Sequence, residues 1–200
     1  VTELLYHEGY HVVGVDIAPD MITQARAKAE TNNYSIPYHI QDAAELNLDK
    51  QRFDLCVSLF DSLNYILAPD RLAMAFQKVF AHLHTGGLFI FDLNSDFALK
   101  NNFFDQDNIH SNEPLKYDWQ STYYPKTNLC KVDMQFAYAE ESGEIVQFKE
   151  VHWQYAYSSE QVVQMLTEAG FSLYEMYQAY TLRAPKPTAD RIFYVAKKTG

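Results

Sequence analysis

The first half of the chain alternates short apolar runs with helical patterns, and this alternation limits the possible folds more than any other feature. The apolar runs lie at 11–16, 38–40, 53–59 and 88–93. The first is rich in valine, which is typical of a strand buried on both faces of a sheet. Strands that alternate with helices form a parallel sheet with helices packed on it. We therefore predict a doubly wound α/β sheet over residues 1–99.

Helical spacing of apolar residues fills the intervals between these runs. One helix is predicted to start near Asp20, and a clearer one starts at Pro69 and presents an apolar stripe: Leu72, Phe76, Val79, Phe80 and Leu83. Paired glycines, Gly86 and Gly87, are expected to end this second helix. Residues 1–8 resemble the last turns of a helix, with Leu4 and Leu5 facing inward.

The second half of the chain has a different pattern. After a polar stretch at 101–114, which is expected to be a loop, three segments alternate with period two: 116–124, 129–139 and 145–157. Ser158 and Gln161 then match a capping box before a helix that ends near Gly170. Two final strands are expected at 172–180 and 191–197. The predicted domains are an α/β core, 1–99 and 158–200, and an inserted antiparallel β-sheet, 100–157.

Composition excludes several functional classes. The formal net charge is −10, with 16 Lys and Arg against 26 Asp and Glu, which argues against nucleic-acid binding and against a polybasic membrane surface. The two cysteines have no CxxC spacing, so neither a disulfide framework nor a structural zinc site is predicted. No His, Asp or Glu spacing suggests a metal site. Without a signal peptide or a run of about 18 apolar residues, a cytoplasmic protein is expected.

Two acidic residues end successive predicted strands. Asp16 follows the first strand and Asp42 follows the second. At the carboxyl edge of a parallel sheet, such acids can bind a nucleoside, one at the ribose hydroxyls and the other at the adenine amino group. Met21 would then cover the adenine ring. The alternatives are that Asp16 caps the next helix and that Met21 is a core residue.

Several segments together resemble the motifs of class I S-adenosylmethionine-dependent methyltransferases. The similar segments are Val12 to Ile22, Gln41-Asp42-Ala43, Phe53 to Ser58, Leu83 to Phe91, Ala169-Gly170-Phe171 and Arg191 to Lys197. The resemblance implies a Rossmann-like sheet with a C-terminal antiparallel hairpin, and S-adenosylmethionine as cofactor. By the same resemblance, the expected cofactor-binding residues are Asp16, Ile17, Met21, Asp42, Ala43, Leu59, Phe60 and Asp61.

One motif of that family is missing from this sequence. The family's first motif is a strand that ends in a Gly-rich turn, and no such turn precedes Asp16. That strand normally lies at the centre of the sheet, where its absence would leave backbone groups unpaired, at about 1–3 kcal/mol each if buried. We therefore expect the native protein to contain on the order of ten to fifteen further residues upstream. The alternative is a degenerate relative that binds no cofactor.

Candidate catalytic residues lie in two segments. Asn64 and Tyr65 follow the third predicted strand, where they could meet the acceptor or the sulfonium, Tyr65 through a cation–π contact; alternatively, they cap the following helix. In the last inserted strand, His152 could accept a proton from an amine or hydroxyl nucleophile, with Glu150 orienting it. Because Glu150 and His152 alternate with apolar residues, a merely solvated sheet face is the other interpretation.

The sequence thus predicts methyl transfer from S-adenosylmethionine to a nitrogen or oxygen of a small-molecule acceptor. The inserted sheet would act as a lid over the carboxyl edge. Two other functions remain open at this point: a non-catalytic binding or dimerisation module, and a nicotinamide-dependent oxidoreductase. The acceptor, and whether the protein is a monomer or a homodimer, are left open.

Overall fold

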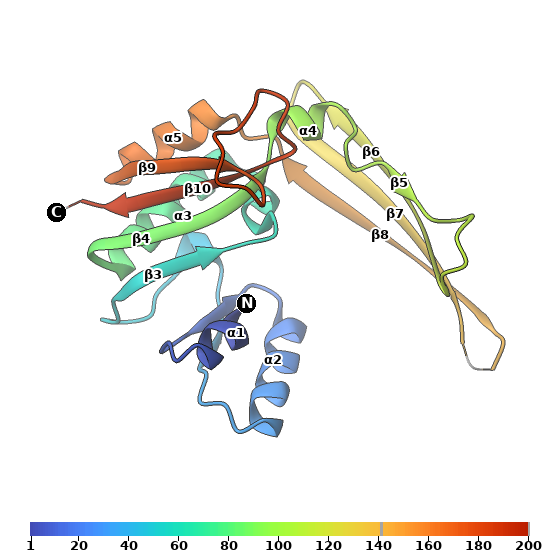
Figure 1. Cartoon of the computed structure of the whole chain (residues 1–200), viewed down its shortest axis with the longest axis horizontal. Coiled ribbons are helices and arrows are strands. Elements are labelled where there is room, and N and C mark those ends of the chain that lie inside the picture. The colour runs from blue at the N-terminus through green and yellow to red at the C-terminus, as the bar shows by residue number, and fades with distance from the viewer. Residues whose placement is uncertain (141, 200) are drawn as a thin grey trace.

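The computed structural model describes residues 1–140 and 142–199, which form three β-sheets and their connecting helices (Figure 1). The sheets have the strand orders β1-β2, β3-β4-β10-β9 and β5-β6-β7-β8. The α-helices are α1 (Thr2–His7), α2 (Pro19–Thr31), α3 (Pro69–His82), α4 (Asp96–Lys100) and α5 (Ser159–Glu168), and the 3-10 helices are η1 (Ala43–Glu45) and η2 (Ser62–Tyr65). The strands are β1 (Gly14–Asp16), β2 (Tyr38–Ile40), β3 (Phe53–Ser58), β4 (Leu83–Asn94), β5 (Gln106–Asp107), β6 (Leu115–Tyr124), β7 (Leu129–Ala139), β8 (Ile145–Tyr155), β9 (Phe171–Gln178) and β10 (Arg191–Lys198).

The largest hydrophobic core lies on the sheet β3-β4-β10-β9. β3 is parallel to β4, whereas β10 is antiparallel to both of its neighbours, which gives the predicted C-terminal hairpin. α3 and α5 pack side by side on one face of this sheet (Figure 1). Phe76 of α3 lies with its ring centroid 5.8 Å from that of Phe89 and 5.3 Å from that of Phe91. The apolar stripe read from the sequence therefore does face the sheet, as amphipathic helices do.

β1 and β2 form a separate parallel pair, from Gly14 opposite Tyr38 to Asp16 opposite Ile40. α2 packs on this pair through a small core of Ile22, Ala29, Ile36 and Tyr38. In the described part of the chain, no strand pairing joins β1 to β3. The strand that we expect between them stays a prediction.

The strands β5 to β8 form a meander, which we call the insert sheet. β6, β7 and β8 are antiparallel and extend well beyond the core (Figure 1). Near the core, this sheet packs on α4 through Leu99, Cys130, Val132 and Ala156. The short strand β5 falls within 101–114, where we expected only a loop.

The glycine pair does not end α3, so that expectation was wrong. The helix ends at His82 and β4 begins at Leu83, so both glycines lie inside the strand. Phe53 pairs with Leu83 and Leu55 with Leu88, a register shift that marks a bulge in β4. Gly86 has a φ of +85°, and a Cβ on Gly87 would lie 2.9 Å from the His84 carbonyl oxygen. The bulge therefore favours glycine at position 86 because of its left-handed backbone, and at position 87 because a Cβ would collide with a backbone oxygen.

The N-terminal elements are also less buried than expected. β1 begins at Gly14 rather than at residue 11, and Val15 is 38% exposed, so this strand is not covered on both faces. Leu4 of α1 is 70% exposed instead of facing inward. Among the described residues, β1 has one strand neighbour and α1 has no buried residue.

Candidate functional site

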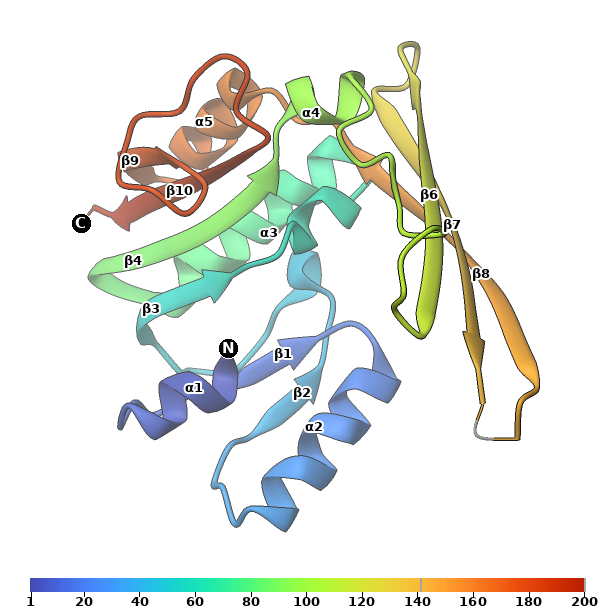
Figure 2. The ribbon, with the colours of Figure 1, turned by 45° about the vertical axis from the view of Figure 1, so that its right-hand side comes forward.

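The carboxyl ends of β1, β3 and β4 all point toward the insert sheet (Figure 2). In α/β folds, ligands bind outside this edge. Asp16 is the last residue of β1, Asp42 comes two residues after β2, and Phe60 comes two residues after β3. The predicted cofactor-binding residues are therefore brought to one edge of the structure.

Asp16 has a free carboxylate oxygen at this edge. Its Oδ1 accepts a hydrogen bond from the Ala18 amide at 2.9 Å, and its Oδ2 has no partner in the described part of the chain. The helix-cap interpretation is wrong, because the cap residue of α2 is Ala18 and no side chain caps that helix. An exposed carboxylate with an open oxygen is suited to accept hydrogen bonds from ribose hydroxyls.

Three of the predicted cofactor-binding residues are exposed apolar side chains. Ile17 is 65% exposed, Met21 58% and Phe60 66%. The interpretation of Met21 as a core residue is therefore wrong. Ala43 and Leu59 are half-buried. Apolar surface beside a few polar acceptors is the usual lining of a small-molecule site, so these residues fit an adenosine group.

Asp42 is held by two partners. Its Oδ1 accepts from the Ala44 amide at 2.8 Å and caps η1, and its Oδ2 accepts from Arg71 at 2.8 Å. Burial alone would raise the pKa of the Asp42 carboxyl, but these two donors outweigh burial and hold it below its ordinary value. Asp42 is therefore a fixed negative charge at the end of β2.

A strained turn follows β3. Phe60 and Asp61 both have positive φ angles, 61° and 50°. The Asp61 carboxylate accepts from Arg191 at 2.7 Å through Oδ1 and from Gln154 at 2.6 Å through Oδ2. The Asp61 amide donates to Asp92 Oδ2 at 3.1 Å. The carboxylate that we expected to face the cofactor is thus bonded to protein groups on both oxygens.

Asn64 is fully buried rather than open to a ligand. Its Nδ2 donates to the carbonyl oxygens of Asn94 and Tyr155, and its Oδ1 accepts from the Asn94 amide at 2.9 Å. It does not cap α3, whose first turn has no side-chain cap. The Asn64 carboxamide joins η2 to the ends of β4 and β8.

Tyr65, His152 and Glu150 form a hydrogen-bonded chain. The Tyr65 hydroxyl lies 2.9 Å from His152 Nδ1, and His152 Nε2 lies 3.0 Å from Glu150 Oε2. Partial burial raises the pKa of the Tyr65 hydroxyl above its ordinary value, so this group is protonated at neutral pH. The assignment that satisfies all three groups has Tyr65 donating to Nδ1 and Nε2–H donating to Glu150. His152 is thus bonded to Tyr65 of η2. The side chains of His152 and Glu150 are 30% and 51% exposed, as the solvated-face interpretation also expects.

Sequence reasoning missed Arg191, Asp92 and Arg71. Asp92 is fully buried inside the apolar run of β4, and a charged residue in such a run is the signal that could have indicated a buried ion pair. Nothing in the sequence marks Arg191 as the partner of Asp92 or Arg71 as the partner of Asp42, because these contacts join residues far apart in the chain.

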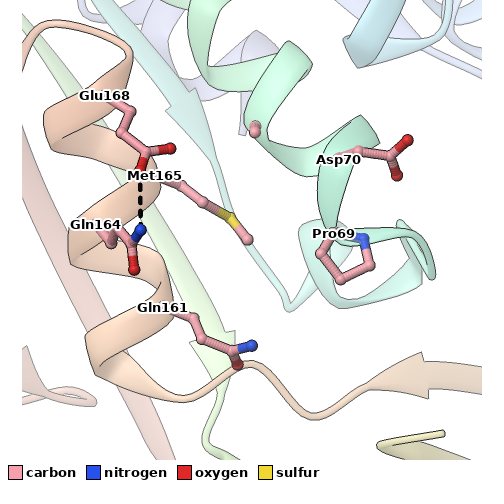
Figure 3. A pocket seen from close by; sticks show the side chains of 7 residues that line it. Pro69, Asp70, Gln161, Gln164, Met165 and Glu168 are labelled. Atoms are coloured by element: carbon pink, nitrogen blue, oxygen red, sulfur yellow. Dashed lines mark hydrogen bonds between the residues drawn. The ribbon is translucent and has the colours of Figure 1, made fainter.

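Two hollows in the surface lie away from this edge. One, of about 240 Å³, lies between α3 and α5 and is lined by Pro69, Asp70, Ala73, Gln161, Gln164, Met165 and Glu168 (Figure 3). The other, of about 480 Å³, is lined by Ile90, Tyr177, Tyr180, Thr181, Leu182, Phe193 and Val195. Neither contains a predicted site residue, and the chemistry gathers at the carboxyl edge instead.

Two negative findings concern the described residues only. They contain no group of His, Cys, Asp and Glu that could hold a metal ion. None of their helices has the length and apolar character that crossing a bilayer requires.

Comparison with known proteins gives consistent matches. The "Methyltransferase domain" family matches residues 1–87. A protein of Geobacillus sp. (strain WCH70) that is named as a methyltransferase is 33% identical over 195 residues, which are 97% of this chain and 78% of that protein. The crystal structure of an S-adenosylmethionine-dependent methyltransferase from Clostridium acetobutylicum ATCC 824 matches with a TM-score of 0.85 and 26% identity, over 96% of this chain and 76% of that one. CalS10, an amino pentose methyltransferase from Micromonospora echinaspora solved with S-adenosylmethionine bound, shares the fold with a TM-score of 0.75 and 20% identity, over 94% of this chain and 74% of that one.

These matches agree with the geometry described above. The sheet is of the Rossmann-like α/β type, and an open carboxylate and exposed apolar side chains follow its strands at the carboxyl edge. The chain belongs to the class I S-adenosylmethionine-dependent methyltransferases, and S-adenosylmethionine is its cofactor.

Proposed function

We propose that the protein transfers the methyl group to a nitrogen or oxygen atom of a small molecule, and that residues 100–157 form a lid domain over this acceptor. When bound, S-adenosylmethionine supplies an electrophilic methyl group carried by a positively charged sulfur. The observation that carries the proposal is the chain Tyr65–His152–Glu150. It places a base and a hydroxyl where the core meets the lid.

The cofactor's adenosine is assigned to the exposed residues of the edge. Asp16 would bind the ribose hydroxyls through its open oxygen, and Ile17 and Met21 would cover one side of the adenine. Phe60 would lie against the cofactor from the end of β3. Asp42 would accept from the adenine amino group, since each carboxylate oxygen has a second lone pair.

Two predicted contact residues receive a different role. Asn64 is buried and bonded to backbone groups, and Asp61 is bonded to Arg191 and Gln154. Both are therefore assigned as positioning residues that hold the segment carrying Phe60 and Tyr65.

Tyr65 is the member of the chain that an acceptor can reach, because its side chain is exposed while both ring nitrogens of His152 are bonded. The acceptor N–H or O–H would donate to Tyr65 Oη. As the acceptor formed its bond to the methyl carbon, the carbon–sulfur bond would break and leave its electron pair on sulfur. The acceptor proton would pass to Tyr65, and the Tyr65 proton would pass to His152 Nδ1. Glu150 then stabilises the resulting imidazolium. General base assistance of this kind contributes about 10²–10⁴-fold to rate.

The lid face that carries His152 also carries apolar residues. Val132 pairs with His152 and Met134 with Glu150, and the rings of Phe136 and Phe148 stack at 4.7 Å further out. An acceptor with an apolar portion beside its amine or hydroxyl suits this surface. CalS10 is an amino pentose methyltransferase, so small amino sugars are a second acceptor class to test.

The experiment incubates the purified protein with S-adenosylmethionine labelled in its methyl group and with a cell extract divided into small-molecule and macromolecular fractions. Label is expected in the small-molecule fraction, and His152→Ala should abolish most of it. The matched control is His84→Ala, an exposed histidine at the amino end of β4. Label confined to protein or nucleic acid would contradict the proposal.

A further inference from the structure

The turn at Phe60–Asp61 has a conformation that its residues do not favour. Both have positive φ angles, 61° and 50°, and neither is glycine. Phenylalanine is a bulky residue for which this region is unusual. Such conformations persist only where surrounding contacts impose them, and they gather at functional sites. The contacts that impose this one therefore matter to what the turn presents.

Three strands supply those contacts. Asp92 of β4 accepts from the Asp61 amide at 3.1 Å, Arg191 of β10 donates to Asp61 Oδ1 at 2.7 Å, and Gln154 of β8 donates to Asp61 Oδ2 at 2.6 Å. A short turn that is bonded through its backbone amide and both carboxylate oxygens has little freedom to change conformation.

Arg191 is the central member of this set. Its Nη1 donates to Asp92 and its Nη2 to Asp61, so one guanidinium bridges two carboxylates. The side chains are secluded, with Arg191 18% exposed, Asp61 16% and Asp92 0%. A guanidinium presents its donors in a fixed planar fork, which an ammonium group cannot reproduce. Without Arg191, two carboxylates would share a secluded site with no cation between them.

Gln154 extends the set into the insert sheet. Its Oε1 accepts from Asn94 Nδ2 at 3.0 Å while its Nε2 bonds Asp61. It lies two residues from His152 on the same face of β8. The turn that carries Phe60 and the strand that carries His152 are therefore fixed to each other.

We propose that Arg191 is a positioning residue, whose bridge between Asp61 and Asp92 holds the strained turn and thereby sets both Phe60 and the His152 strand in place. The inference rests on the proposed function in one respect, the assignment of Phe60 to the cofactor. If Arg191 acts in this way, cofactor binding at the core should reduce the mobility of β8, although β8 belongs to the lid.

The test compares Arg191→Met and Arg191→Lys with the unchanged protein. Two quantities are measured: amide hydrogen exchange, with and without S-adenosylhomocysteine, and calorimetric affinity for that ligand. Without ligand, residues 59–65 should exchange faster in Arg191→Met. The affinity should fall at least about tenfold, and the ligand-induced protection of 150–155 should disappear. Arg191→Lys should recover part of the affinity and part of the ligand-induced protection, since a lysine can pair with only one carboxylate at a time. Lys197→Met, at the other end of β10, should behave like the unchanged protein.

The outcomes separate this inference from the proposed function. If the unchanged protein binds no S-adenosylhomocysteine, the proposed function fails, and ligand-free exchange at 59–65 still decides whether Arg191 holds the turn. A folded Arg191→Met with unchanged exchange and affinity overturns the inference. Should Arg191→Met fail to fold, Gln154→Leu removes the two bonds that join β8 to Asp61 and Asn94 and leaves the Arg191 bridge in place. In this variant, S-adenosylhomocysteine is expected to give no protection of residues 150–155 from amide exchange. If the ligand still protects these residues, the proposed coupling is overturned.

Discussion

The hydroxyl of Tyr65 lies 2.9 Å from Nδ1 of His152, although 87 positions separate the two residues in the chain. Tyr65 belongs to η2 beside the core sheet, and His152 belongs to β8 of the insert sheet. This bond joins the two parts of the molecule, and the proposed proton path runs through it.

Replacing His152 by Ala should lower turnover by about 10²–10⁴-fold, because the proton path loses its final base. The affinity for S-adenosylhomocysteine should stay within about twofold, because His152 bonds Tyr65 and Glu150 rather than any residue assigned to the cofactor. Steady-state kinetics with the acceptor found by labelling, together with calorimetry, checks both numbers. A large loss of cofactor affinity with unchanged turnover would show that His152 contributes to cofactor binding and not to proton transfer from the acceptor.

Tyr65→Phe tests the relay itself. It keeps the ring and removes the hydroxyl that is assigned to contact the acceptor, so turnover should fall nearly as far as in His152→Ala, and the double variant should be little worse than either one. Groups that act as one unit show this non-additivity. Independent, multiplying effects would show that Tyr65 and His152 do not act in one path.

Replacing Asp42 by Asn should destabilise the protein at neutral pH. The pKa of Asp42 lies below its ordinary value, so its ionised form stabilises the folded state above the unfolded pKa of about 3.9. That contribution is lost as the pH falls through the lower folded pKa. The Tm difference from the unchanged protein should therefore be constant from about pH 5 to 8 and shrink below about pH 4. Asp107→Asn, on β5, is the control, and a Tm gap that widens in acid would refute the sign.

Cys130 should resist alkylation in the native protein. It is fully buried against α4, and burial, helped by the nearby Asp105, raises the pKa of its thiol to about 11. Only the thiolate reacts readily. Iodoacetamide labelling of a Cys56→Ser variant at mildly alkaline pH, followed by mass spectrometry, isolates this thiol. Rapid labelling would mean that the insert sheet separates from α4 in solution.

The capping box of α5 gives a stability prediction that is independent of the site. The Ser158 hydroxyl accepts from the Gln161 amide, and the Gln161 side chain accepts from the Ser158 amide. Ser158→Ala should cost about 1 kcal/mol, measured by urea unfolding. Ser172→Ala, an exposed serine on β9, serves as its control. Equal stability of both variants would show that the cap contributes nothing.

Local patterns predicted much of this fold. The spacing of Leu72, Phe76 and Val79 located α3, because a helical stripe depends only on residues within a few turns. The Ser158–Gln161 signature located α5 for the same reason. Gly86 and Gly87 gave a wrong prediction, because glycines are common both after helix ends and in β-bulges. Only the pairing of β4 with β3 shows that these glycines belong to a bulge.

The position of the candidate site at the carboxyl edge could be predicted from the sequence, but the contacts between its residues could not. Asp16 and Asp42 could be placed at strand ends because parallel strands bring their carboxyl ends to one edge. The ion pairs of Arg191 could not, because they depend on how β4, β10 and the insert sheet pack together. His152 could be proposed from the sequence as a candidate base, but its bond to Tyr65 is visible only in three dimensions.

The measurement that tests the central claim most directly is calorimetric titration of the purified protein with S-adenosylhomocysteine, repeated with Asp16→Ala and with the control Glu30→Ala on α2. The account predicts micromolar binding, unchanged in Glu30→Ala and weaker by about 1–3 kcal/mol in Asp16→Ala, because the ribose hydroxyls lose their acceptor. No binding by the folded protein would contradict the cofactor site, and equal binding by Asp16→Ala would remove Asp16 from it.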